Sequence, residues 1–226
     1  MLLNIEAVLF DLDGTLLDRR RSFARFVRQQ WERFAPSLGT VSQEDYVQAV
    51  AERDRDGYGP RKDLFTGLSA RFELPPALPQ RLLEDYRVRF PGACLLFPDA
   101  KPTLSALRAA GIKLGLITNG SVRMQGRKLE CLALRPMFDT ILISEAEGAH
   151  KPDRRIFERA LERLNTDPAR AVFVGDDPDA DVAGARAAGM HAIWRRDPHV
   201  LRTVAADTII DELGDLVSLL RTGRAS

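Results

Sequence analysis

Short apolar runs that end in polar or turn residues alternate along most of this chain with helical patterns. The runs are rich in Val, Ile and Leu, which is typical of strands buried on both faces of a parallel sheet. They cover residues 7–10, 113–117, 140–143, 171–174, 191–194 and 208–210. Helical patterns lie between and after them, at residues 102–110, 121–133, 153–164, 180–188 and 212–220. This alternation predicts an α/β fold with an open parallel sheet and right-handed crossovers.

The long stretch between the first and second expected strands follows a different pattern. It has helical periodicity at residues 22–34, 42–55 and 79–90, contains no strand-like run, and is punctuated by glycine and proline. We therefore expect two domains. An α/β core with a Rossmann-like sheet takes residues 1–18 and 92–226, and an all-helical insertion takes residues 19–91.

Charge and composition exclude several classes of partner. The formal net charge of +1 gives no global field that would attract nucleic acid or an anionic membrane. No apolar run is long enough to cross a bilayer, and Asn4, Glu6 and Asp11 interrupt the apolar N-terminus, so no signal peptide is expected. Cys94 and Cys131 are too few for a disulfide framework. We expect a cytoplasmic enzyme, either a monomer or a homodimer, that binds neither nucleic acid nor membrane.

Polar residues follow the expected strands, at the edge of the sheet where open α/β folds bind ligands. The motifs at these ends are Asp11-Leu12-Asp13-Gly14-Thr15, Thr118-Asn119-Gly120, His150-Lys151-Pro152-Asp153, and Gly175-Asp176-Asp177 with Asp181 just beyond. Pro152 is placed to start a helix. Ser121 opens a helical pattern, which favours a phosphate-binding loop over a hairpin at Asn119-Gly120.

Several carboxylates that converge on one spot repel one another and repel a phosphate dianion. A divalent cation with oxygen ligands makes such a cluster tolerable, and Mg²⁺ is the usual ion shared with phosphate groups. Mg²⁺ and Lys151 together supply three positive charges, which offset the three carboxylates of Asp11, Asp13 and Asp176. Charge neutralisation and positioning are most of what phosphoryl transfer requires. The residues therefore predict a magnesium-dependent site for phosphate esters.

The four motifs, in this order, resemble those of the haloacid dehalogenase (HAD) superfamily. Within it, the chain is similar to the phosphatases whose helical cap is inserted after the first strand. The resemblance covers essentially the whole chain, most loosely at residues 19–91. It implies a phosphoric monoester hydrolase that uses Mg²⁺ on a small phosphorylated metabolite, with the insertion as a cap that sets substrate specificity.

The first motif would supply the reacting groups. Asp11 would attack phosphorus and form an aspartyl-phosphate, which is a known role for carboxylates in covalent catalysis. Asp13 would protonate the leaving oxygen and then activate water, as one acid/base group can do in two steps. The resemblance adds that the backbone carbonyl of Asp13 binds Mg²⁺.

The remaining motifs would bind phosphate and metal. Thr118, Asn119 and Gly120 would hold phosphate oxygens through the Thr118 hydroxyl and the backbone, and Lys151 would fix nucleophile and phosphate together. The expected metal residues are Asp11, Asp13 and Asp176. Asp177 or Asp181 would bind the metal through water or orient Lys151, although either could instead cap the helix that follows.

Four other functions stay open. A dehalogenase of the same fold uses an aspartate nucleophile but needs neither Mg²⁺ nor a leaving-group acid, so Asp13 and the acidic fourth motif argue against it. A phosphomutase shares all the phosphatase residues. A phosphonate-cleaving relative would want a lysine placed by its cap. A non-catalytic binding protein of this fold typically loses the nucleophile or the acid, and both are present here.

The sequence narrows the substrate only to broad classes. The segment from Thr118 through Lys151 to Phe157 is similar to nucleotidases and sugar-phosphate phosphatases. Sugar phosphates, phosphoglycolate and nucleoside monophosphates are therefore the expected classes. Basic residues of the insertion are candidate contacts to a phosphorylated substrate, namely Arg53, Arg55, Arg61 and Lys62.

Overall fold

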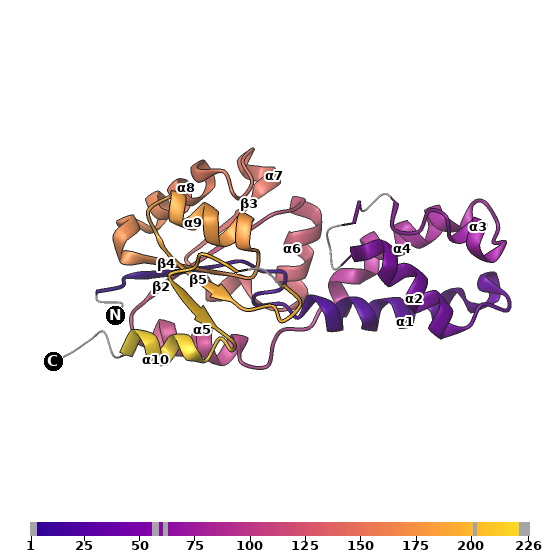
Figure 1. The fold of residues 1–226 in the computed structure, drawn as a ribbon, viewed down its shortest axis with the longest axis horizontal. Helices are drawn as coiled ribbons and strands as arrows, with labels where there is room; N and C mark the ends of the chain where they lie inside the picture. Colours follow the sequence, from indigo (N-terminus) through magenta and orange to yellow (C-terminus); the bar gives the residue numbers. More distant parts are fainter. Residues whose placement is uncertain (1–3, 56–58, 61–62, 201–202, 222–226) are drawn as a thin grey trace. The chain divides into compact units, whose positions relative to one another are not determined.

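Six parallel strands form one sheet in the order β3-β2-β1-β4-β5-β6 (Figure 1). The computed structural model describes residues 4–55, 59–60, 63–200 and 203–221. The strands are β1 (Ala7–Phe10), β2 (Lys113–Thr118), β3 (Thr140–Ile143), β4 (Ala171–Gly175), β5 (His191–Arg195) and β6 (Thr208–Ile210). The expected parallel α/β fold is confirmed.

Helices cover both faces of this sheet, as its apolar strands require. The helices of this part are α5 (Ala100–Ala109), α6 (Val122–Cys131), α7 (Ser144–Glu147), α8 (Arg154–Leu164), α9 (Gly184–Ala187) and α10 (Asp215–Arg221), with the short turns η3 (Arg135–Met137), η4 (Pro168–Arg170) and η5 (Pro178–Ala183). Figure 1 shows α8 and α9 on one face and α5 and α10 on the other. All four residues of β1 are fully buried between these layers.

Local signals fix several of the helix ends. The Ser121 hydroxyl caps α6 by accepting a hydrogen bond from the Met124 amide. Gly111 and Gly189 have φ values of 76° and 80°, the left-handed conformation that the expected helix ends require. Pro152 was expected to start a helix, but α8 begins at Arg154. Its cap is Asp153, whose carboxylate accepts a hydrogen bond from the Arg155 amide.

The helix expected at residues 180–188 begins two residues earlier and opens as a π-helical turn, η5. Asp177 caps this turn, and its carbonyl accepts hydrogen bonds from the amides of both Asp181 and Val182. The hydrogen bond from the Val182 amide spans five residues and widens the turn. A π-helical turn of this kind often lies at a functional site.

The chain divides into two compact units, one of Met1–Asp18 with Leu96–Ser226 and one of Arg19–Leu95. The second unit consists of helices α1 (Arg19–Leu38), α2 (Gln43–Asp54), α3 (Leu68–Phe72) and α4 (Leu78–Ala93). It extends past residue 91 because α4 continues to Ala93 and the Leu95 amide then donates to the Ser22 hydroxyl at 2.8 Å.

The second unit has a hydrophobic core of its own. Phe23, Phe26, Tyr86 and Phe90 pack through edge-to-face and stacked ring contacts between α1 and α4. Among the described residues, no helix is long and apolar enough to span a bilayer.

Candidate active site

The order of the strands brings three motif ends together. β1 pairs with β2 on one side and with β4 on the other, so the residues that follow these three strands share one edge of the sheet. The Asp11 amide continues the β1–β4 ladder by donating to the Val174 carbonyl at 2.9 Å. Asp11, Thr118 and Asp176 therefore lie at the ends of neighbouring strands.

Lys151 joins the first and fourth motifs. Its ammonium group donates to Asp11 Oδ1 and to Asp181 Oδ1, each at 2.6 Å, and the residue is only 3% exposed. Burial acts to lower the pKa of Lys151, but the two carboxylates outweigh it and hold that pKa above its ordinary value. Lys151 is therefore a fixed positive charge beside Asp11.

Asn119 positions the loop that carries Lys151. Its side-chain amide donates to the Lys151 carbonyl and accepts from the Lys151 amide, both at 2.9 Å. The Asn119 side chain thus binds the backbone of the third motif, whereas the phosphate contact was expected from the backbone of Asn119. The Gly120 amide, also expected to hold phosphate, donates to the Ser144 hydroxyl at 2.9 Å.

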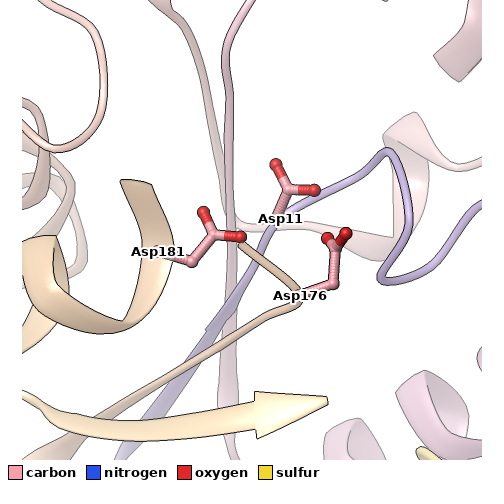
Figure 2. Close-up of side chains that lie close together, drawn as sticks. All are labelled: Asp11, Asp176 and Asp181. Atoms are coloured by element: carbon pink, nitrogen blue, oxygen red, sulfur yellow. The ribbon is translucent and has the colours of Figure 1, made fainter. Parts of the chain in front are cut away.

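Asp11, Asp176 and Asp181 form a cluster in which one carboxylate oxygen of each residue lies within 4.8 Å of the others (Figure 2). Burial raises the pKa of Asp11 to about 7, against the opposing charge of Lys151. Burial and the neighbouring Asp11 carboxylate also hold the pKa of Asp176 well above its ordinary value. Negative charge in this cluster is thus incompletely compensated by the protein itself.

Two hydrogen bonds and a closely packed glycine fix the position of Asp176. The Thr15 hydroxyl donates to its Oδ1 at 2.9 Å, and the Trp194 indole donates to its backbone carbonyl at 2.9 Å. Gly14 passes so close that an added Cβ would lie 2.2 Å from Asp176 Oδ2. The Gly14 carbonyl in turn accepts a hydrogen bond from Arg195 at 3.1 Å.

The two other acidic residues of the fourth motif differ in their contacts. Asp177 caps η5 by accepting from the amides of Asp179 and Ala180. Asp181 accepts from Lys151 through Oδ1 and from the Asp177 amide through Oδ2. Of the two, Asp181 is the one in contact with Lys151.

Asp13 points to a different set of partners. Lys128 lies 2.7 Å from both of its carboxylate oxygens, and Gln125 donates to Oδ2 at 2.8 Å. The same Gln125 amide group donates to the Thr118 hydroxyl oxygen at 2.5 Å. Because that oxygen accepts a hydrogen bond, the Thr118 O–H can donate to a ligand.

Gln125 and Lys128 lie outside the four sequence motifs, although a signal for them exists. Both are buried, at 2% and 5% exposure, on the same side of α6 as Leu129. A polar residue on the inward face of an amphipathic helix needs a partner. The spacing of Ser121, Gln125 and Lys128 places them on the helix face that follows the second motif.

The comparisons with known proteins identify the family. The family model for haloacid dehalogenase-like hydrolases matches residues 5–189. The chain belongs to this family. A glyceraldehyde 3-phosphate phosphatase from Methanothermobacter thermautotrophicus is 32% identical over 96% of this chain and 100% of its own length. A phosphoglycolate phosphatase from Caulobacter vibrioides is 30% identical over 95% of this chain and 90% of its own. The family and these relatives show that the chain is a phosphatase, as expected.

Solved structures share this fold along nearly the whole chain. The HAD-hydrolase YfnB from Bacillus subtilis, bound to magnesium, has a TM-score of 0.76 and 25% identity over 96% of this chain and 99% of its own. A 2-haloacid dehalogenase from Pseudomonas syringae has a TM-score of 0.61 and 30% identity over 96% of this chain and 99% of its own. The fold alone therefore does not separate the two chemistries.

The carboxylate cluster of this HAD chain fits a divalent cation. In their ionised forms, Asp11, Asp13, Asp176 and Asp181 supply four negative charges against the two ammonium groups of Lys128 and Lys151, and one divalent cation balances the difference. Oxygen ligands of this kind suit Mg²⁺. In the part of the chain that the structure describes, Asp11 and Asp176 are better placed to hold it than Asp181, both of whose oxygens accept hydrogen bonds.

Proposed function

We propose that this chain is a magnesium-dependent phosphatase that hydrolyses a small phosphorylated metabolite through an aspartyl-phosphate at Asp11. The observation that carries the proposal is the buried Asp11 carboxylate, with Lys151 2.6 Å from Oδ1 and Asp176 in the same oxygen cluster. A nucleophile in this setting is oriented by a cation that cannot act as its base, because the pKa of Lys151 is raised.

Each residue of the site has a separate role in the two steps of the reaction. Asp11 attacks phosphorus through its carboxylate, while the Lys151 ammonium and the Thr118 hydroxyl hold phosphate oxygens. A Mg²⁺ ion held by Asp11, Asp176 and the Asp13 backbone would neutralise charge on the transferring group. Asp13 gives its proton to the leaving oxygen and then takes one from the water that hydrolyses the aspartyl-phosphate.

Asp181 acts through Lys151 in this scheme. Its contact keeps the ammonium group directed at Asp11 Oδ1. Asp177 stabilises η5, the turn that carries Asp181, by capping its first amides. We propose no direct metal contact for Asp177.

The expected substrates are sugar phosphates, phosphoglycolate and nucleoside monophosphates. The glyceraldehyde 3-phosphate and phosphoglycolate phosphatases among the relatives support the first two classes. We further propose that the helical unit Arg19–Leu95 acts as the cap that chooses among them. Of its candidate basic residues, Arg61 and Lys62 lie outside the described residues. A screen of phosphorylated metabolites, ranked by kcat/KM, identifies the substrate.

The cytoplasmic location and the monomeric or homodimeric state remain predictions from the sequence. The phosphomutase alternative also remains, since it would use the same residues. The dehalogenase alternative is weakened by Asp13 and by the Asp11–Asp176–Asp181 cluster, because displacement of a halide requires neither a leaving-group acid nor a metal ion.

Removal of divalent cations should reduce phosphate release to background, and added Mg²⁺ should restore it. The reason is that four carboxylates with two ammonium partners repel a phosphate dianion unless a cation is present. Phosphate release is measured with excess chelator, then with Mg²⁺. Asp176→Asn should need more Mg²⁺ than wild type, whereas the exposed Asp211→Asn should not. Undiminished phosphate release in chelator would overturn the proposed magnesium dependence.

Gly14→Ala should reduce kcat/KM by about 10- to 100-fold, the range found when the supporting partners of metal ligands are lost. Gly14 has φ of 95°, and its added Cβ would lie 2.2 Å from Asp176 Oδ2, so the Asp176 carboxylate must move. The control is Gly111→Ala, which is strained by a similar φ of 76° but meets no atom within 4 Å. Equal activity of the two variants would show that the position of Asp176 is unimportant.

A further inference from the structure

Asp13 is held by three hydrogen-bond donor contacts that come from one face of α6. Lys128 contacts both carboxylate oxygens at 2.7 Å, and Gln125 donates to Oδ2 at 2.8 Å. The Lys128 side chain is 6% exposed and the Asp13 side chain 23% exposed. The ion pair is thus shielded on the lysine side and accessible on the aspartate side.

Gln125 also joins Asp13 to the phosphate-binding motif. Its amide nitrogen donates one hydrogen bond to Asp13 Oδ2 and another to Thr118 Oγ1. An amide nitrogen has two hydrogens, so both bonds form together. Gln125 therefore fixes the separation between Asp13 and the Thr118 hydroxyl, which the proposed function assigns to a phosphate oxygen.

Neither partner can accept a proton from Asp13. An ammonium group donates only, and the Gln125 nitrogen that faces Asp13 is likewise a donor. Two donors meet Oδ2 and one meets Oδ1. Lys128 and Gln125 therefore hold the Asp13 carboxyl group as hydrogen-bond donors, and neither takes its proton.

We propose that Lys128 and Gln125 are positioning residues that hold the Asp13 carboxyl group in place for proton transfer to the leaving oxygen of the substrate. This inference rests on the proposed function. In the step concerned, the bond from phosphorus to the leaving oxygen breaks as the bond to Asp11 forms. The proton passes from Asp13 to the leaving oxygen, and the resulting carboxylate remains paired with the Lys128 ammonium group.

Lys128→Met tests this proposal through the leaving group. kcat/KM reports the steps up to departure of the leaving group and excludes later hydrolysis of the phosphoenzyme. For an alkyl phosphate, whose alkoxide must be protonated, kcat/KM should fall by about 10- to 100-fold, part of the range for general acid catalysis. For 4-nitrophenyl phosphate, whose leaving group needs no proton, it should change by less than about threefold.

The variants include controls for charge and for helix structure. Lys128→Arg retains a cationic donor and should recover part of the loss with the alkyl phosphate. Gln125→Ala should lose activity with both esters, and more with the alkyl phosphate, because Gln125 contacts Thr118 as well as Asp13. Arg123→Met changes an exposed residue of the same helix and should match wild type with both esters. Thermal unfolding of each variant checks that α6 remains folded.

A double variant separates positioning from direct contact with phosphate. If Lys128 acts through Asp13, adding Lys128→Met to Asp13→Asn should cause little further loss, since both changes remove the same function. The competitive inhibition constant of inorganic phosphate should stay within about twofold of wild type in Lys128→Met. A further loss on the Asp13→Asn background, or much weaker phosphate inhibition, would make Lys128 a phosphate ligand and overturn the proposal.

Failure of this inference and failure of the proposed function give different results. If wild type releases no phosphate from either ester with Mg²⁺, the proposed function fails and the inference fails with it. If wild type is active and Lys128→Met loses activity equally with both esters, only the inference is wrong. A selective loss with the alkyl phosphate supports both.

Discussion

Asp11→Asn is expected to abolish phosphate release, with a loss on the order of 10⁴-fold or more. The amide keeps the size and shape of the side chain but lacks the anionic oxygen that attacks phosphorus. Lys151 retains Asp181 as a partner, so the variant should fold with Lys151 still held near its present position. Phosphate release with Mg²⁺, measured for wild type and variant under the same conditions, gives the ratio.

The control for this experiment is Asp153→Asn. Asp153 caps α8 next to the Lys151 motif and is paired with Arg155, which holds its pKa at about 2. Its replacement changes an aspartate without touching the cluster, so activity should stay within a few-fold of wild type. Substantial turnover by Asp11→Asn would mean that another group attacks phosphorus.

Asp13→Asn is expected to lower turnover of an alkyl phosphate by roughly 10²–10⁴-fold. The variant keeps the Asp11 nucleophile and the backbone carbonyl of residue 13, but it loses the proton for the leaving group and the base for water. With 4-nitrophenyl phosphate, the first transfer should still occur and produce a burst of nitrophenolate followed by a stall. Rapid mixing that follows nitrophenolate release measures both phases.

The comparison of the two aspartates gives a clear criterion. Asp11→Asn should show no burst with either ester, because no phosphoenzyme forms. Asp13→Asn should show a burst only with the activated ester. Equal bursts in both variants would contradict the roles assigned to Asp11 and Asp13.

The strands and the motif residues could be predicted from the sequence because both are local signals. A run such as residues 7–10 is buried wherever it lies in a parallel sheet, and the residue after it must lie at the sheet edge. The positions of Asp11, Thr118 and Asp176 at neighbouring strand ends follow from that rule. The site chemistry assigned to them remains a proposal.

The side-chain partners could not be predicted in the same way. Asn119 binds the backbone of Lys151 across 32 residues, and Lys128 binds Asp13 across 115 residues. Such pairs depend on how α6 and the Lys151 loop pack against the sheet, which the spacing of motifs does not specify. The start of α8 differs from the expectation for a related reason, since Pro152 suits a helix start but the Asp153 cap determines it.

The partners that the motifs do not specify leave the charge balance of the site unchanged but divide the two lysines between two aspartates. From the sequence, three carboxylates are balanced by Lys151 and a divalent ion. The structure adds Asp181 and Lys128, one charge of each sign, so the balance with one divalent cation is unchanged. The two lysines, however, serve different aspartates. Lys151 faces the proposed nucleophile, and Lys128 faces the proposed acid.

The most direct test of the central claim is to locate the phosphoryl group on the protein. Asp13→Asn is mixed with 4-nitrophenyl phosphate and Mg²⁺, quenched in the stalled phase, reduced with borohydride to convert an acyl phosphate to an alcohol, and digested for peptide mass spectrometry. We predict reduction at Asp11 and at no other carboxylate, and none when Asp11 is also changed to Asn. Modification at another residue, or an unlabelled protein despite a nitrophenolate burst, would contradict an aspartyl-phosphate at Asp11.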